Sequence, residues 1–295
     1  MKLPSGTQHG AAPTSLLVEM ARRCEEAGAD GVVLGEHVVM GPRPGDYAWG
    51  DFPFGVDAPF PEPMVALSAV AAVTRRLVLT TGVLVAALRP APLLAKQAAT
   101  LDELSGGRLE LGVGTGWQRE ELEALGVPFD QRGPALTDTI GACRALWREQ
   151  PARFQSPTVS FDELWCEPRP PLGRPPVHFA GTLNERNLRR VVELGDGWIP
   201  IMGATDESVA SDAARLRATW DDAGRGPEPP RIRVALPLRR VDGRLSPRAT
   251  LAGWEAAAVG GGTDLTIPMA AFVRTEADLD RFVEELGEAR ASLPG

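Results

Sequence analysis

The chain has 295 residues, of which 43% are hydrophobic and 24% are charged, enough to bury one large core. Its formal net charge is −8, which argues against a surface that neutralises the phosphates of a nucleic acid, so we expect no nucleic-acid partner. Three scattered cysteines and three scattered histidines form neither a disulfide framework nor the ligand spacing of a metal site.

The amino-terminal segment predicts a brief strand followed by a helix. Residues 1–4 are the candidate strand, and the region lacks the apolar stretch of a signal peptide. No later window approaches ~18 consecutive apolar residues, so we expect a cytoplasmic protein with no membrane contact. Residues 14–28 place apolar side chains at helical spacing and close at Gly28, which predicts an amphipathic helix.

Strands and helices are expected to alternate along the rest of the chain. Apolar runs predict strands near 30–38, 76–85, 107–116, 176–181, 196–202, 231–238 and 263–269, and helical patterns lie near 62–74, 90–104, 184–194, 205–223, 247–259 and 275–291. With the brief first strand this makes eight βα units. The sequence therefore predicts an α/β fold, a single (β/α)8 TIM barrel spanning residues 1–295.

Two segments, 41–61 and 150–175, interrupt this alternation and are rich in proline, glycine and aromatic residues. Long loops of this kind in a compact barrel are typical of lids or site walls, so we expect insertion loops. The first contains Tyr47, Trp49, Phe52 and Phe54, and these side chains either line a substrate pocket or only pack against the protein.

Residues at the carboxyl ends of the strands are the candidates for chemistry, because that edge carries the active site of a barrel. Glu36 and His37 end the strand at 30–38 and could bind a polar ring edge and donate a proton, or could simply cap a loop in solvent. His178 lies within an apolar strand and is expected to be a hydrogen-bonded core histidine. The glycines of segment 111–121 could approach an anion or a ring at a strand-to-helix turn.

The segment at 82–133 (GVLVAALRPAPLLAKQAATLDELSGGRLELGVGTGWQREELEALGVPFDQRG) strongly resembles the luciferase-like flavin- and F-420-dependent oxidoreductases. The resemblance extends to 27–38 and 180–201. It implies a barrel enzyme that passes a hydride or activates oxygen at a bound isoalloxazine-like ring. The turn at 114–117 (GTGW) is similar to that of the F-420 branch, which favours coenzyme F-420, a deazaflavin, over FMN.

The resemblance also implies roles for individual residues. It matches Glu36 to ring binding and His37 to proton donation, although the family's acidic residue is commonly aspartate. A non-prolyl cis peptide and bulge behind the ring match Gly82 and Val83. The remaining expected cofactor contacts are Thr81 at the ring edge, Thr115 and Gly116 after the next strand, and Gly181 and Thr182 near the coenzyme phosphate.

Trp117 stands where the sugar-phosphate-oxidising relatives carry a catalytic glutamate. Indole cannot take a proton from an alcohol, which favours reduction of a C=C or C=N bond over oxidation of a sugar phosphate. A packed aromatic wall is the alternative. Trp198 is a further candidate for the pocket, together with Trp49 and Phe54.

Three functions follow as hypotheses. The first is an F-420-dependent oxidoreductase that transfers a hydride between the deazaflavin and a small organic substrate, with His37 as proton donor. The second is an FMN-dependent monooxygenase, and the third is a barrel that binds a flavin without turnover. Because the similar proteins are often homodimers, we expect a homodimer here as well.

Overall fold

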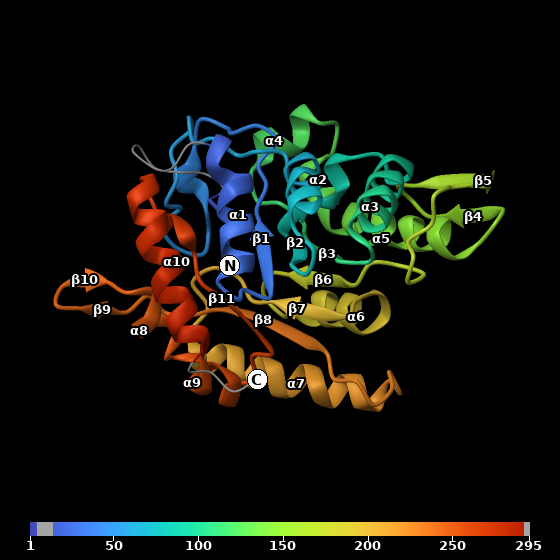
Figure 1. Cartoon of the computed structure of the whole chain (residues 1–295). Coiled ribbons are helices and arrows are strands. Elements are labelled where there is room, and N and C mark those ends of the chain that lie inside the picture. The colour runs from blue at the N-terminus through green and yellow to red at the C-terminus, as the bar shows by residue number, and fades with distance from the viewer. Residues whose placement is uncertain (5–13, 292–295) are drawn as a thin grey trace.

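The computed structural model describes residues 1–4 and 14–291, and its centre is a parallel sheet of seven strands (Figure 1). Their order in the sheet follows their order in the chain: β1 (Gly31–Leu34), β2 (Val78–Val85), β3 (Leu109–Gly114), β6 (Val177–Ala180), β7 (Gly197–Ile199), β8 (Arg231–Ala235) and β11 (Asp264–Thr266). All carboxyl ends therefore meet at one edge, as the predicted alternation requires.

The predicted eighth strand at 1–4 is absent, and the expectation of a closed eight-stranded barrel is wrong. Lys2 instead forms single parallel bridges to Val33 and to Pro268. The Lys2 amide donates to the Ile267 carbonyl at 2.9 Å. Pro4 has no amide hydrogen with which to extend a ladder, so the segment contacts both edge strands without forming a strand.

Ten α-helices flank the sheet in the described part of the chain (Figure 1). They are α1 (Leu17–Glu26), α2 (Pro63–Val73), α3 (Ala91–Ser105), α4 (Arg119–Ala124), α5 (Arg132–Arg148), α6 (Glu185–Leu194), α7 (Asp206–Asp222), α8 (Pro247–Leu251), α9 (Trp254–Val259) and α10 (Glu276–Ala291). The expected helix at 247–259 is divided before Gly253, a residue with poor helix propensity. None of the described helices is both long and apolar enough to cross a membrane.

The two insertion segments differ in structure. Segment 150–175 contains an antiparallel hairpin, β4 (Ala152–Gln155) and β5 (Ser160–Leu164), which projects beyond α5 in Figure 1. Segment 41–61 has only the short 3-10 helix η2 (Pro44–Asp46) and otherwise no regular structure. A second hairpin, β9 (Arg240–Val241) and β10 (Arg244–Leu245), was not predicted.

Candidate active site

The carboxyl edge of the sheet brings His37 close to a carboxylate that the sequence did not single out. His37 follows β1, and its Nδ1 lies 2.9 Å from Oε2 of Glu121, in the first turn of α4. The other oxygen of Glu121 accepts a hydrogen bond from the Val38 amide at 2.6 Å. The side chains of His37 and Glu121 are 9% and 1% exposed. A buried carboxylate therefore fixes the orientation of the imidazole and leaves Nε2 for proton transfer.

Aromatic side chains of segment 41–61 surround the imidazole. The ring centroid of His37 lies 5.5 Å from that of Phe52 and 5.8 Å from that of Trp117, both edge to face. Phe60, near the end of the same segment, is nearer still at 4.8 Å. Tyr47 contacts Trp117 at 5.2 Å. These rings form an apolar enclosure in which a proton on His37 is shielded from water.

Of the expected pocket residues, Phe52 and Trp117 lie at the imidazole, and Phe54 and Trp49 lie further out. Phe54 reaches His37 only through Phe52 and Phe60, at centroid distances of 5.3 and 5.4 Å. Trp49 is 40% exposed and contacts Tyr47. The rings of segment 41–61 thus pack on one another as well as on the candidate site.

Glu36 does not contact its neighbour His37. Its carboxylate is buried, accepts from the Val85 amide at 2.9 Å, and forms an ion pair with Arg89, which also reaches Glu62. Burial raises the pKa of Glu36 above its ordinary value, although the hydrogen bond and charge of Arg89 act in the opposite direction. The expected contact between Glu36 and a bound ring stays a prediction.

Strand β2 has the irregularity that the resemblance implied. The Gly82–Val83 peptide is cis, and the register of β2 against β3 shifts between Thr81 and Leu84. A Cβ on Gly82 would lie 2.2 Å from Cγ1 of Val33, so only glycine fits there. The hydroxyl of Thr81, however, is buried and donates to the Gly112 carbonyl at 2.8 Å. The structure therefore directs Thr81 into the sheet.

The turns after β3 and β6 present glycine backbone at the same edge. Gly116 has φ +73°, and a Cβ there would lie 2.9 Å from Cγ1 of Val85. Gly181 has φ +116°, and its carbonyl accepts a hydrogen bond from Nε1 of Trp198 at 2.8 Å. Trp198 is itself buried in the core. It therefore supports the turn after β6, and its place at a substrate pocket stays a prediction.

Thr115 and Thr182 lie in these two turns. The Thr115 hydroxyl is 3.3 Å from the Gly116 carbonyl, and Thr182 is exposed. The structure thus brings both residues to the expected edge, and their contacts with a cofactor stay predictions.

Hydrogen bonds tie the loop after β1 to the turn after β3. Gln118 accepts from the Gly41 amide at 2.7 Å, and Glu120 pairs with Arg43 on the surface. Together with Glu121, these contacts hold segment 41–61 over the site. One signal in the sequence indicates Glu120 and Glu121. Acidic residues in the first turn of a helix that follows a strand lie at the carboxyl edge of the sheet and complement the helix dipole.

A second group of charged side chains occupies the opposite half of the sheet. Glu110 of β3 pairs with Arg233 of β8 at 2.6 Å and with Arg231, and His178 lies 3.3 Å from the same carboxylate. Burial alone would raise the pKa of Glu110, but the close contact with His178 and the two guanidinium charges hold this pKa far below its usual range. His178 is 1% exposed, so its predicted place in the core is confirmed, but neither ring nitrogen has a hydrogen-bond partner among the described residues, so the predicted hydrogen bond is not.

The comparisons with known proteins agree with this arrangement. Residues 2–244 match the family described as luciferase-like monooxygenase. The chain belongs to this family. Its glycine turns, cis peptide and candidate histidine thus belong to a luciferase-like protein whose main sheet has seven strands in the described part of the chain.

The proteins similar to this luciferase-like chain include one described as FMNH2-dependent and one described as F-420-dependent. The chain is 36% identical to an uncharacterized protein of Mycobacterium tuberculosis over 190 residues, 64% of this chain and 66% of that one, just under two thirds of its length. It is 30% identical to an FMNH2-dependent dimethylsulfone monooxygenase of Pseudomonas fluorescens, over 57% of this chain and 46% of that one. An F-420-dependent secondary alcohol dehydrogenase, solved with an F-420-acetone adduct, shares the fold at TM-score 0.64 and 15% identity, over 94% and 87% of the two chains.

The residues at the carboxyl edge fit a flavin-like ring. Nη1 of Arg89 is buried and has no hydrogen-bond partner in the described part of the chain, and the ring's pyrimidine portion offers carbonyl acceptors for such a donor. The glycine turns at Gly116 and Gly181 let backbone approach a ligand closely. Among the described residues no group of histidine, cysteine and carboxylate side chains is arranged to hold a metal ion.

Proposed function

We propose that this chain is an F-420-dependent oxidoreductase that acts on a small organic substrate, with His37 as its proton donor. The observation that carries the proposal is the His37–Glu121 contact of 2.9 Å inside the aromatic enclosure. When bound, the coenzyme supplies or accepts the hydride. The protein supplies the proton, excludes water and orients the substrate.

Glu121 is proposed to hold His37 in the state that donates. A carboxylate only accepts hydrogen bonds, so Nδ1 must carry a hydrogen to bond with Glu121. The negative charge of Glu121 stabilises the imidazolium, and Nε2 then presents the proton to the substrate. The Val38 amide keeps the carboxylate in place through its second oxygen.

Trp117 is proposed to direct the enzyme towards reduction of a C=C or C=N bond. Its indole contacts both His37 and Phe52, and it offers no base that could take a proton from an alcohol. His37 is thus the group at this point best suited to proton transfer. The proposed substrate is an apolar small molecule. It would bind between Trp117 and the aromatic side chains of segment 41–61 and take the place of some of their contacts with each other.

The proposed coenzyme-binding residues lie at the carboxyl edge of the sheet. Backbone at Gly82 and Val83 would face the back of the ring, while Glu36 would hold Arg89 in place for the ring's acceptors. Gly116 and Thr115 would contact the ring, and the turn with Gly181 and Thr182 would contact the coenzyme phosphate. Assembly as a homodimer is part of the same proposal.

A monooxygenase that uses reduced FMN is the second candidate, because the relative from Pseudomonas fluorescens carries that description. A paired titration separates the two. We expect fluorescence quenching to show micromolar binding of F-420 and at least tenfold weaker binding of FMN. Preference for FMN together with oxygen consumption by the reduced complex would replace the first proposal with the second.

The role of His37 has its own test. We expect His37→Ala to lower turnover by about 10²–10⁴-fold, the usual contribution of a general acid, and to change the dissociation constant of the coenzyme less than about threefold. Val39→Ala, an exposed change in the same loop, is the matched control and should retain full turnover. Equal loss of binding and turnover would refute proton donation, and tight binding without turnover in the unchanged chain would indicate a non-catalytic barrel.

A further inference from the structure

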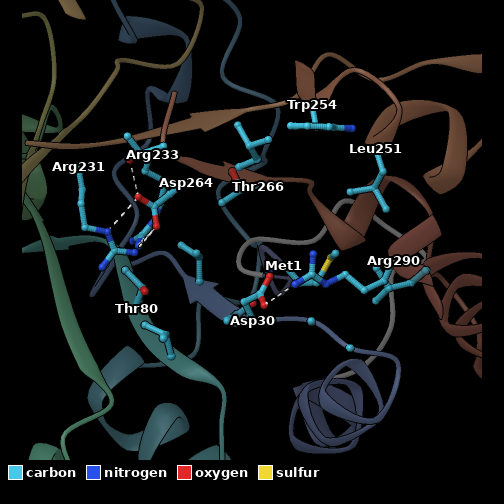
Figure 2. A pocket seen from close by; sticks show the side chains of 18 residues that line it. Met1, Asp30, Thr80, Arg231, Arg233, Leu251, Trp254, Asp264, Thr266 and Arg290 are labelled. Atoms are coloured by element: carbon cyan, nitrogen blue, oxygen red, sulfur yellow. Dashed lines mark hydrogen bonds and ion pairs between the residues drawn. The ribbon is translucent and has the colours of Figure 1, made fainter. Parts of the chain in front are cut away.

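A cavity of about 420 Å³ lies at the amino-terminal end of the sheet, opposite the edge that carries His37. Its lining includes the first residues of four strands: Gly31 of β1, Val78 of β2, Arg231 of β8 and Asp264 of β11. Helices contribute part of the remaining wall, with Leu251 from α8 and Trp254 from α9 (Figure 2). The volume falls within the range of small-molecule sites.

One donor at this cavity has no acceptor. Arg233 lines it and is 7% exposed. Its Nη2 donates to Glu110 at 2.6 Å, whereas Nη1 is buried and has no hydrogen-bond partner in the part of the chain that the structure describes. A buried guanidinium hydrogen without an acceptor is unfavourable, so this position favours an incoming oxygen.

The acidic side chains around Arg233 are already engaged. Glu110 binds Arg231 as well as Arg233, and Asp264 accepts from Nε of Arg231 at 3.1 Å and from the Thr263 hydroxyl at 2.8 Å. These acceptors are therefore committed to a network of ion pairs. The free donor must find its partner elsewhere, and a charged oxygen makes the stronger bond to a guanidinium.

The cavity is polar on one side and apolar on the other. Figure 2 shows Arg231, Arg233 and Asp264 together on one side, and Trp254 and Leu251 across from them. Arg290 and Asp30 form a pair between the two sides, at 3.2 Å. A ligand that satisfies both sides has an oxyanion at one end and an apolar body at the other.

We propose that this cavity is a second ligand site, which binds a small organic oxyanion: a carboxylate or phosphate monoester with an apolar body. One oxygen accepts from Nη1 of Arg233, and the apolar body packs against Trp254 and Leu251. The site is separate from the proposed coenzyme site, since it lies at the other end of the strands.

The experiment uses benzoate and phenyl phosphate as the two probes, with the full chain and isothermal titration calorimetry. We expect saturable binding, one probe per chain, for at least one of them. Tighter binding of benzoate assigns a carboxylate ligand, and tighter binding of phenyl phosphate assigns a phosphate ligand. Absence of saturable binding by both probes would overturn the proposal.

Two variants locate the binding. Arg233→Lys shortens the donor while keeping its charge, and Ala29→Leu fills the cavity from a lining position outside the network of Glu110, Arg231, Arg233 and Asp264. Each should weaken binding by about tenfold or more, as expected for loss of a charge-assisted hydrogen bond or of the volume needed. His37→Ala should leave it unchanged. Binding that survives both cavity variants, or that is lost in His37→Ala, would refute this site.

Discussion

Replacement of Glu121 by glutamine tests the catalytic hypothesis where the structure is most specific. Oε1 of the glutamine still accepts from the Val38 amide, so the loop after β1 keeps its anchor. The amide nitrogen, however, donates where Oε2 accepted, 2.9 Å from Nδ1 of His37. The change therefore removes the negative charge beside the imidazolium and favours the opposite tautomer of the ring.

The size of the effect follows from the type of bond that is lost. A hydrogen bond to a charged group contributes about 1.5–3 kcal/mol, and each 1.4 kcal/mol changes a rate about tenfold. We expect Glu121→Gln to lower kcat by roughly 10–150-fold, with the dissociation constant of the coenzyme within about threefold of its original value. Glu123→Gln is the matched control, since Glu123 pairs on the surface with Arg119 of its own helix, and its kcat should not change.

Two measurements together test whether Glu121 supports proton donation by His37. Steady-state turnover gives kcat, and ¹⁵N NMR of the His37 ring reports which nitrogen carries the hydrogen. The hypothesis requires a hydrogen on Nδ1 in the unchanged chain and a different ring state in Glu121→Gln. A kcat in Glu121→Gln within threefold of the unchanged chain would show that the His37–Glu121 contact is structural only.

Three further changes probe the charges and supports around the two ends of the sheet. Arg89→Met should lower the free energy of unfolding by about 3–5 kcal/mol at pH 7, because it leaves the buried carboxylate of Glu36 without an opposite charge; the folded pKa of Glu36 is raised, so urea denaturation should show a smaller loss as pH falls. Glu110→Gln should lower the free energy of unfolding by a similar amount at pH 7. The folded pKa of Glu110 is lowered, so this loss of stability should shrink below about pH 4.3 in the same urea assay. Trp198→Phe removes the donor to Gly181 and should cost about 1 kcal/mol by thermal denaturation, with weaker coenzyme binding.

The sequence predicted the strands well because each is a short apolar run between polar turns, and the seven that form the sheet were all expected. Helix α5 was missed, since Gly133, Pro134 and Gly141 interrupt its pattern. The closed barrel was wrong because Lys2 makes only single bridges to Val33 and Pro268, and Pro4 has no amide hydrogen with which to extend either ladder. Periodicity identifies elements, whereas closure depends on how the two edge strands approach each other.

The candidate site was predictable only where position along a strand implies position in space. His37 and Trp117 were found because they follow strands whose carboxyl ends share an edge. Glu121 and Arg89 were not, because they meet their partners across 84 and 53 residues of chain. Pairing at such separations is set by packing between helices and strands, which local spacing in one sequence does not report.

The two ends of the sheet should act independently, and this can be measured. Glu110, at the network of the amino-terminal end, precedes Gly114 by four residues on β3, about 13 Å along a strand, and the contacts of Arg233 include none of those made by Glu121. Changes at separate sites without shared partners add to within about 0.5 kcal/mol. The double variant Glu121→Gln with Arg233→Lys should therefore show the turnover loss of the first and the probe-binding loss of the second, each unchanged. A turnover loss that differs by more than about threefold from that of Glu121→Gln alone would instead reveal coupling through β3, and a ligand in the amino-terminal cavity would then regulate the chemistry at His37.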